Sequence, residues 1–376
     1  MISISENPMI RLFVQDQNRL EGDAIQQLKK AGELPGTECI AAMPDLHPGK
    51  GGPVGAAFLT RNIFYPHLIG SDVGCGMGLW QSDLRKGKLK RDKWAKRLFG
   101  FEEPWEGDTN QWLAGYGLKS SGFDDALGTI GGGNHFAELQ MVEQIRDQAA
   151  FDALGMDRDF LMLLIHSGSR GLGASLLRSH TDVKGAAGLE SASDEAQRYI
   201  RKHDNALVWA EANRALIAHR FLSALGAEGK KILDIRHNAV SHVRESGKNM
   251  WLHRKGVVPS DRGPVIIPGT RGSLTYLAMP AGDQAANLWS LAHGAGRKWN
   301  RTSVKGRLKD RFHAKSMTQT ELGGLVICED KALLYEEAPQ AYKNIDRVIG
   351  DMTDAGLIQI IAVFRPLITY KTRSAK

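Results

Sequence analysis

The sequence predicts an α+β fold in which mixed β-sheets are accompanied by helices. Short apolar runs broken by glycine and proline fill residues 37–80 and 231–280, a pattern typical of strands joined by tight loops. Between them, from about Ser193 to Leu225, apolar side chains recur at helical spacing. No repeat, low-complexity tract or linker divides the chain, so we expect one domain over residues 1–376.

The individual elements follow from the same patterns. Residues 159–166 (DFLMLLIH) predict a buried strand that ends on a histidine and leads into the glycine loop SGSRGLG. The stretch 193–225 contains no proline and predicts a long helix, which is either continuous or broken near His203. A helix near 281–300 and a final apolar strand around 357–364 (LIQIIAVF) complete the expected elements.

Composition excludes several classes of protein. Hydrophobic residues make up 42% and charged residues 24%, which is typical of folded proteins and not of disordered or collagenous ones. The 3 cysteines are too few and scattered for a disulfide framework, so we expect a reducing cytoplasm. The N-terminal stretch is not a signal peptide and no long uncharged apolar run occurs, so we expect no export and no membrane span.

The charge balance permits a polyanionic partner without demonstrating one. The net charge is +7, and the stretch RKGKLKRDKWAKR (residues 85–97) contains 8 lysines and arginines with 1 acid. Two interpretations of this stretch remain open, a solvated helix face or a patch that contacts phosphates.

Several residues that can bind a metal stand in glycine-rich loops or at strand ends. Each of them alone is more often a structural residue, but a cysteine, an aspartate and three histidines in such settings together indicate a cluster of ligands from separate segments. These ligand types alone favour zinc. The residues are Asp72, Cys75, His135, His166 and His237.

A further histidine, His293, lies in the segment AHGAGRKWNR (292–301). Its small neighbours Gly294, Ala295 and Gly296 would let a phosphate approach the imidazole and the backbone N–H groups, and histidine can act as a covalent nucleophile. The alternative is a glycine-lined histidine at the start of a helix. No P-loop, dinucleotide-binding glycine motif or K-x-D-G motif is present, so a nucleotide would bind at an unusual site.

Together these segments resemble the RtcB family of RNA-splicing ligases. The similar segments occur in the family's order over nearly the whole chain. They are MPDLHPGKG (43–51), GSDVGCGMG (70–78), LGTIGGGNHFAELQ (127–140), LIHSGSRGLG (164–173), RHN (236–238), HRKGVVP (253–259), IIPGTRG (266–272), HGAGR (293–297), AYKNID (341–346) and RPLITYK (365–371).

The resemblance implies a sandwich-like core of mixed sheets with peripheral helices, and a centre of two Mn²⁺ ions held by the five residues above, with Cys75 positioned to bridge. It implies that His293 attacks the α-phosphorus of GTP, which gives a histidine–GMP intermediate and releases pyrophosphate. A carboxylate such as Glu138 suits the N1–H and N2–H₂ edge of guanine. The implied nucleotide-binding residues are Asn134, Phe136, Glu138, His237, Asn238, Thr270, His293, Gly294, Ala295, Gly296, Tyr342 and Lys371.

The reaction implied is the joining of RNA 3′-phosphate or 2′,3′-cyclic phosphate ends to 5′-hydroxyl ends, in RNA repair or tRNA splicing. Arg170 or Arg297 would stabilise charge on the phosphoryl oxygens. The chain departs from the family pattern in having Thr270 and Arg271 where Ser-Met is common, in its shorter length, and in the residues TRSAK after Lys371. These departures suggest a divergent branch that repairs cleaved RNAs.

Two other functions fit parts of the sequence. A metal-dependent phosphohydrolase acting on RNA cyclic phosphates would need the metal ligands but not His293, and the intact HGAGR and AYKNID segments argue against it. A non-catalytic factor that binds RNA ends would be expected to lack some of the metal ligands, and all of them are present.

Overall fold

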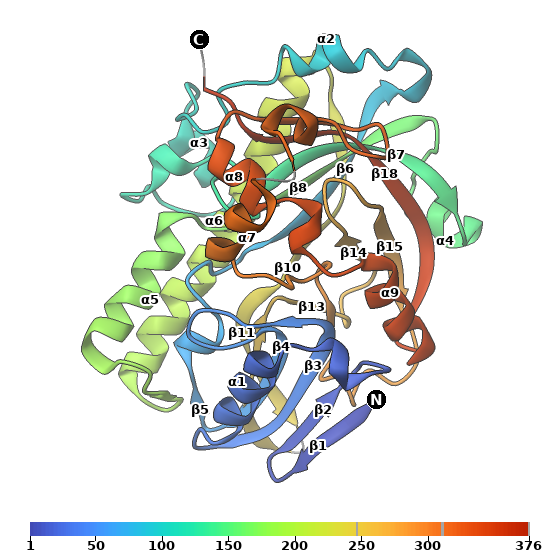
Figure 1. Cartoon of the computed structure of the whole chain (residues 1–376). Helices are drawn as coiled ribbons and strands as arrows, with labels where there is room; N and C mark the ends of the chain where they lie inside the picture. The colour runs from blue at the N-terminus through green and yellow to red at the C-terminus, as the bar shows by residue number, and fades with distance from the viewer. Residues whose placement is uncertain (246, 310–311, 375–376) are drawn as a thin grey trace.

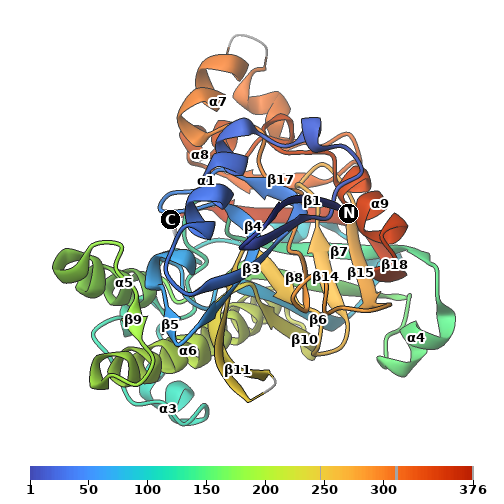
Figure 2. The same ribbon diagram turned by 90° about the horizontal axis from the view of Figure 1, so that it is seen from below.

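A computed structural model describes residues 1–245, 247–309 and 312–374 (Figure 1). The predicted α+β class is confirmed, with two large sheets and helices around them (Figures 1 and 2). The helices are α1 (Gly22–Gly32), α2 (Arg91–Ala95), α3 (Thr109–Ala114), α4 (Gln148–Ala153), α5 (Gly171–Lys184), α6 (Asp194–Leu225), α7 (Arg301–Leu308), α8 (Lys331–Glu336) and α9 (Ile345–Asp354).

The strands fall into two large sheets and two short pairs. One sheet has the order β1-β2-β3-β4-β12-β11, and the other β10-β6-β8-β7-β18-β15-β14 with β17 alongside β18. The strands are β1 (Ile2–Glu6), β2 (Met9–Leu12), β3 (Thr37–His47), β4 (Val54–Arg61), β5 (Ile63–Phe64), β6 (Gly76–Arg85), β7 (Phe136–Ile145), β8 (Phe160–Ser167), β9 (Leu189–Glu190), β10 (Gly229–Arg236), β11 (Asn238–Glu245), β12 (Lys248–Lys255), β13 (Val257–Pro259), β14 (Val265–Pro268), β15 (Thr275–Pro280), β16 (Ser290–Ala292), β17 (Leu325–Cys328) and β18 (Ile358–Thr372).

The eight-stranded sheet is apolar on both faces, and the alternation of side chains decides what each face contacts. In β8, Leu161, Leu163 and Ile165 pack in one cluster with residues of α6. Met162 and Leu164 point the other way, into the cluster shared with β3 and β4 of the six-stranded sheet. The sandwich-like core follows from this division, because one face of the sheet is covered by a helix and the other by a second sheet.

The predicted long helix is confirmed as α6, which is continuous, so the alternative of a break near His203 is excluded. The Ser193 side chain accepts a hydrogen bond from the N–H of Ala196 at the start, and Gly226 ends the helix in the left-handed conformation. His203 is buried in the apolar stripe, and its Nε2 accepts a hydrogen bond from the N–H of Val240 at 3.2 Å. The polar side chain therefore has a partner in the core and does not interrupt the helix.

A second buried polar residue, Arg214, ties α6 to the sheet. Its guanidinium makes two bonds to the carboxylate of Asp234, at 2.6 and 2.7 Å, and donates to the carbonyls of Gly74 and Ser167 at 2.8 and 2.9 Å. Only 1% of Arg214 is exposed. Since Gly74 precedes β6 and Ser167 ends β8, this one side chain fixes the ends of two neighbouring strands.

The predicted helix near 281–300 is wrong. Leu288 and Trp289 have positive φ angles of 53° and 48°, which an α-helix excludes, and residues 290–292 form β16, paired with β13. The helix begins only at Arg301. The predicted glycine loop after β8 is also shorter than expected, because α5 begins at Gly171.

The remaining expectations for local structure are confirmed. The buried strand at 159–166 is β8, the strands at 37–80 are β3 to β6, and the final apolar strand is β18, which continues to Thr372. Within the part of the chain that the structure describes, no helix is long and apolar enough to cross a membrane.

We predict that Arg214→Leu lowers the free energy of unfolding by ~3–5 kcal/mol, because it leaves the Asp234 carboxylate buried without its partner. The measurement is urea unfolding of the variant beside Arg201→Leu, an exposed arginine on the same helix that should cost ~0.5 kcal/mol or less. The double variant Arg214→Leu/Asp234→Leu should recover part of the stability. Equal stability of the two single variants would contradict this role.

Candidate functional site

Five neighbouring strands of the large sheet end or begin at the same edge. The order is β10-β6-β8-β7-β18, and all four pairings are antiparallel. The register places Gly76 opposite both Arg236 and Ser167, and Phe136 opposite His166. The loops and strand ends that carry the predicted ligands are therefore brought together by backbone pairing alone.

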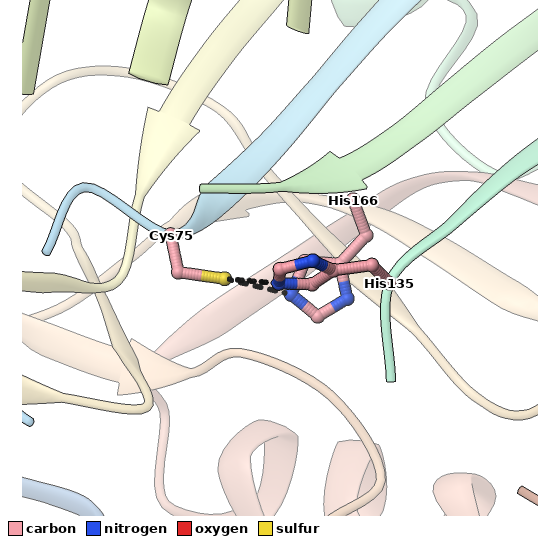
Figure 3. Close-up of side chains that lie close together, drawn as sticks. All are labelled: Cys75, His135 and His166. Atoms are coloured by element: carbon pink, nitrogen blue, oxygen red, sulfur yellow. Dashed lines mark hydrogen bonds between the residues drawn. The ribbon is translucent and has the colours of Figure 1, made fainter. Parts of the chain in front are cut away.

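Three of the predicted metal ligands form a buried cluster at this edge (Figure 3). Cys75 precedes β6, His135 precedes β7 and His166 lies near the end of β8. The sulfur of Cys75 lies 3.4 Å from Nε2 of His135 and 3.3 Å from Nε2 of His166, and the three side chains point toward one another (Figure 3). Ligands bound to one ion at ~2.0–2.3 Å stand ~3–3.5 Å apart, so these separations suit a shared metal.

The other two predicted ligands lie beside this cluster. Oδ2 of Asp72 is 2.8 Å from Nε2 of His135, and the ring of His237 is centred 5.1 Å from that of His166. Gly168 leaves room for the carboxylate of Asp72, because a Cβ atom at position 168 would lie 2.2 Å from Oδ1 of Asp72. The structure thus gathers all five predicted ligands, from four separate segments of the chain.

Two polar atoms at this site lack the partners that buried groups normally have. Oδ1 of Asp72 and Nδ1 of His237 are buried and make no hydrogen bond to any residue that the structure describes. Such atoms are costly unless something else binds them. A cluster of thiol, carboxylate and imidazole groups with unpartnered lone pairs therefore fits a divalent metal.

The electrostatics of the cluster favour uncharged imidazole rings and an uncharged thiol. Burial, together with neighbouring histidines, holds the pKa values of His166 and His237 well below the usual range. Burial and the nearby Asp72 carboxylate raise the pKa of the Cys75 thiol well above its ordinary value. Burial alone would raise the pKa of Asp72, but His135 and Arg170 lower it. The imidazoles are thus available as ligands, and the thiol would release its proton only when a cation binds.

His293 lies next to the cluster, in the loop after β16 and not at a helix start. Its ring is centred 4.6 Å from that of His237, which extends the row of imidazoles. Nδ1 of His293 lies 2.7 Å from Oδ2 of Asp45, a fully buried carboxylate that also accepts the backbone N–H of His293 at 3.2 Å. Because a carboxylate is paired with Nδ1, the proton is expected there, and the lone pair of Nε2 is left free.

Most of the predicted residues line one cavity of ≈ 270 Å³ beside His293. All the predicted nucleotide-binding residues line it, and so do Asp72, Cys75 and His166 of the metal cluster. The cavity residues predicted from the sequence are Asn134, Phe136, Glu138, His237, Asn238, Thr270, Gly294, Ala295, Gly296, Tyr342 and Lys371. His135 is the one predicted ligand outside the lining, and its Nε2 lies 2.8 Å from Oδ2 of Asp72, which does line the cavity.

The carboxylate of Glu138 faces this cavity because of strand parity. In β7, Ala137 and Leu139 pack toward α6, so Glu138 lies on the opposite face, where it accepts hydrogen bonds from Gln140 and Thr369. Burial raises the pKa of Glu138 to about 7, although both hydrogen bonds oppose the shift. Glu138 is therefore a desolvated acceptor on the cavity wall.

Lys371 lies on the same face, near the end of β18. Its ammonium donates to the carbonyl of Gly133 at 2.8 Å and lies 3.9 Å from the carboxylate of Glu337. Burial lowers the pKa of Lys371 to about 8, although Glu337 opposes the shift. Its position is fixed by β18, which pairs with β7 on one side and β17 on the other.

Two predicted charge-stabilising arginines differ in their positions. Arg297 lines the cavity, where it donates to Glu337 at 3.1 Å and lies over the ring of Tyr342. Arg170 is outside the lining and lies behind the metal cluster, 3.4 Å from Nδ1 of His135. Of the two, only Arg297 is placed to meet a ligand in the cavity directly.

Sequence reasoning missed Glu337 and Arg301, which line the cavity, and Asp45, which contacts His293 from outside the lining. A signal existed for Asp45, since it is a carboxylate inside the apolar strand β3. Glu337 and Arg301 gave no such signal. Glu337 follows the short helix α8 and Arg301 follows a loop, and only the tertiary fold determines how these segments pack. Glu337 is buried and lies within ion-pair distance of Arg297, Arg301 and Lys371.

Comparison with known proteins supports the resemblance. The profile of a family described as "tRNA-splicing ligase RtcB" matches residues 27–109 and 118–372. The chain is 46% identical over 357 residues to RNA-splicing ligase RtcB2 of Escherichia coli strain ATCC 25922, covering 95% of this chain and 94% of that protein. It is 29% identical to tRNA-splicing ligase RtcB of Methanococcus maripaludis, covering 93% and 91% of the two chains. It is 26% identical to RNA-splicing ligase RtcB of Escherichia coli K12, covering 98% of each.

These matches extend over nearly the whole chain and include every segment that contributes to the metal cluster and the cavity. Membership of this family supports an RNA ligase activity. The chain belongs to the RtcB family of RNA-splicing ligases.

Proposed function

We propose that this protein is a GTP- and Mn²⁺-dependent ligase that joins RNA 3′-phosphate or 2′,3′-cyclic phosphate ends to 5′-hydroxyl ends through a histidine–GMP intermediate. The observation that carries the proposal is the contact of His293 with Asp45 beside the metal cluster and at the wall of the cavity. A histidine whose Nδ1 is paired with a carboxylate has a nucleophilic Nε2. The cellular role would be RNA repair or tRNA splicing, in the cytoplasm as predicted from the cysteines.

The first step is attack by Nε2 of His293 on the α-phosphorus of GTP. A P–N bond forms, the bond from the α-phosphorus to the bridging oxygen breaks, and pyrophosphate leaves. Asp45 supports this step because it orients the ring and stabilises the positive charge that the imidazole gains. Gly296 permits the close approach of the histidine loop to β3, since a Cβ atom there would lie 2.2 Å from the carbonyl oxygen of Asp45.

Guanine would be selected by Glu138. A carboxylate accepts hydrogen bonds from N1–H and N2–H₂ of guanine, whereas adenine offers no matching pair of donors at that edge. Because Glu138 is buried, a bound adenine would bring no hydrogen-bond donors to its carboxylate at a place that water does not reach. This unfavourable contact would discriminate against adenine. Lys371, Tyr342 and Thr270 would contact the rest of the nucleotide from other sides of the cavity.

The remaining steps transfer GMP and then release it. An oxygen of the RNA 3′-phosphate, formed by hydrolysis when the end is cyclic, attacks the phosphorus of GMP and breaks the P–N bond. The 5′-hydroxyl of the second fragment then attacks the activated 3′-phosphorus, a phosphodiester forms, and GMP leaves. Arg297 lies at the cavity wall where charge on these phosphoryl oxygens would develop.

Two Mn²⁺ ions would be held by Asp72, Cys75, His135, His166 and His237. The sulfur of Cys75 lies within 3.4 Å of the Nε2 atoms of His135 and His166, so these three side chains would hold metal together. When bound, the ions would offset negative charge on the phosphoryl oxygens. The neutral imidazoles and the unpartnered atoms of Asp72 and His237 supply ligands from this chain.

We predict that incubation with GTP and Mn²⁺ adds one GMP to the wild-type protein and none to His293→Ala, as measured by intact-protein mass. The reason is that His293, whose Nδ1 is paired with the Asp45 carboxylate, combines a free Nε2 with a place on the cavity wall beside the cluster. His242→Ala, an exposed histidine outside the cavity, is the matched control and should form the adduct. A metal-loaded wild-type protein without any adduct would favour the phosphohydrolase.

We predict that Asp45→Asn slows adduct formation by ~10–100-fold at saturating GTP, with little change in the GTP concentration needed for half-maximal rate. The amide can no longer stabilise the imidazole as it becomes positively charged, while the nucleotide contacts remain. The measurement is the time course of adduct mass at several GTP concentrations. A change confined to the GTP dependence, with an unchanged maximal rate, would show that Asp45 does not act through His293.

We predict that Cys75→Ser reduces the bound manganese, because the hydroxyl is a poor substitute for a thiolate ligand. The control is Cys39→Ser, a half-buried cysteine of β3 that lies outside the cavity. Metal content is measured by elemental analysis after equilibrium dialysis against Mn²⁺. Equal manganese in wild type and Cys75→Ser would exclude the cysteine as a ligand, whatever the protein's activity.

A further inference from the structure

The basic stretch at residues 85–97 is accounted for by neither the metal cluster nor the cavity. It runs from the end of β6 through α2 and is followed by Phe99, an aromatic side chain that is 50% exposed. Phe99 is one of four large hydrophobic side chains that are exposed in the described part of the chain. Cations next to an exposed aromatic ring are the combination that binds single-stranded nucleic acid.

Four lysines of this stretch are free to meet an external anion. Lys88, Lys90, Lys93 and Lys96 are exposed, and none forms an ion pair with a residue that the structure describes. The other cations of the stretch do have partners. Lys86 pairs with Asp159, Arg85 lies over the ring of Phe160, Arg91 contacts Asp92 and Gly323, and Arg97 donates to the carbonyl of Leu225.

The stretch is held in place and is not a loose tail. Trp94 and Leu98 are buried in the cluster that covers the outer face of the large sheet. Arg373 donates to the carbonyl of Ala95 at 2.8 Å, and its own carbonyl accepts the N–H of Gly100 at 2.7 Å. The exposed lysines and Phe99 are therefore displayed on a fixed backbone, which lowers the entropic cost of binding a ligand.

The same contacts connect the stretch to the end of β18, the strand whose Lys371 side chain lines the cavity. Arg373 follows the cavity residue Lys371 by two positions, which is ~7 Å along an extended chain. On the other side, Arg91 donates to the carbonyl of Gly323, in the turn before β17, and β17 pairs with β18. Both connections tie α2 to β17 and β18, with α2 on the outer face of the sheet and Lys371 on the cavity face.

We propose that Lys88, Lys90, Lys93, Lys96 and Phe99, the α2 patch, form an accessory site for the single-stranded RNA that flanks the ends being joined. The lysines would contact the phosphates and Phe99 would stack on a base, so that the patch adds affinity without sequence preference. The proposal rests on the proposed function, because an RNA held at the cavity is what makes a neighbouring RNA site useful. Acidic side chains follow at Glu102 and Glu103, which limits the patch to the stretch before them.

The test replaces all four lysines with glutamine and measures binding of a single-stranded RNA that ends in a 3′-hydroxyl and cannot be ligated. We expect weaker binding, with the slope of log K against log salt reduced by ~0.7 for each phosphate that the variant no longer neutralises. The matched control replaces four exposed lysines elsewhere, Lys29, Lys30, Lys230 and Lys248, and removes the same charge. Equal effects of the two variants on RNA binding would show that only the net charge matters and not the position of the lysines, which would overturn the proposal.

Ligation kinetics and the Phe99→Ala variant give independent readings. For RNAs with long single-stranded arms, the four-lysine variant should raise KM and leave kcat and GMP-adduct formation unchanged. For RNAs with very short arms, the same variant should show no change in KM.

Phe99→Ala should weaken the binding of single-stranded RNA ~5-fold or more and leave the binding of duplex RNA unaffected. A wild type without a GMP adduct but with patch-dependent RNA binding would sink the ligase proposal alone. A normal adduct with unchanged RNA binding in both variants would sink the accessory site alone.

Discussion

The antiparallel register of β10, β6, β8, β7 and β18 is the constraint on which the rest of the site depends. Backbone hydrogen bonds align the ends of these strands, so residues far apart in sequence meet without any direct attraction between them. Arg214 reinforces this alignment from the helix side, through the carbonyls before β6 and at the end of β8. A one-residue slip of β8 would turn His166 toward α6 and disrupt the cluster.

The site combines groups whose burial would be unfavourable without ligands. Neutral imidazoles, a protonated thiol and unpartnered atoms of Asp72 and His237 lie together in a low-dielectric region. Asp45 differs, because one of its oxygens already has His293 as its partner in the structure described. The metal cluster is thus arranged for an external cation, whereas Oδ2 of Asp45 already contacts His293 and only its Oδ1 makes no hydrogen bond to a described residue.

Much of this arrangement could be predicted from the sequence, and the limits have physical causes. The five predicted metal ligands and His293 stood out because glycine-rich loops and strand ends mark them, and β8 and α6 because their apolar patterns are long. The helix expected near 281–300 failed because positive φ angles at Leu288 and Trp289 are a tertiary outcome that local propensity does not encode. Glu337 could not be found, since its role comes from partners on β18 and in the loop before α7. The range of the single domain stays a prediction.

The most direct test of the account is the anomalous diffraction of crystals grown with Mn²⁺ and GTP. The account predicts manganese peaks within bonding distance of Cys75, His135 and His166, and continuous density from Nε2 of His293 to the phosphorus of GMP in the cavity beside Glu138. Manganese bound elsewhere, or a nucleotide bound away from His293, would contradict the claim that the predicted metal ligands and His293 act together at one cavity.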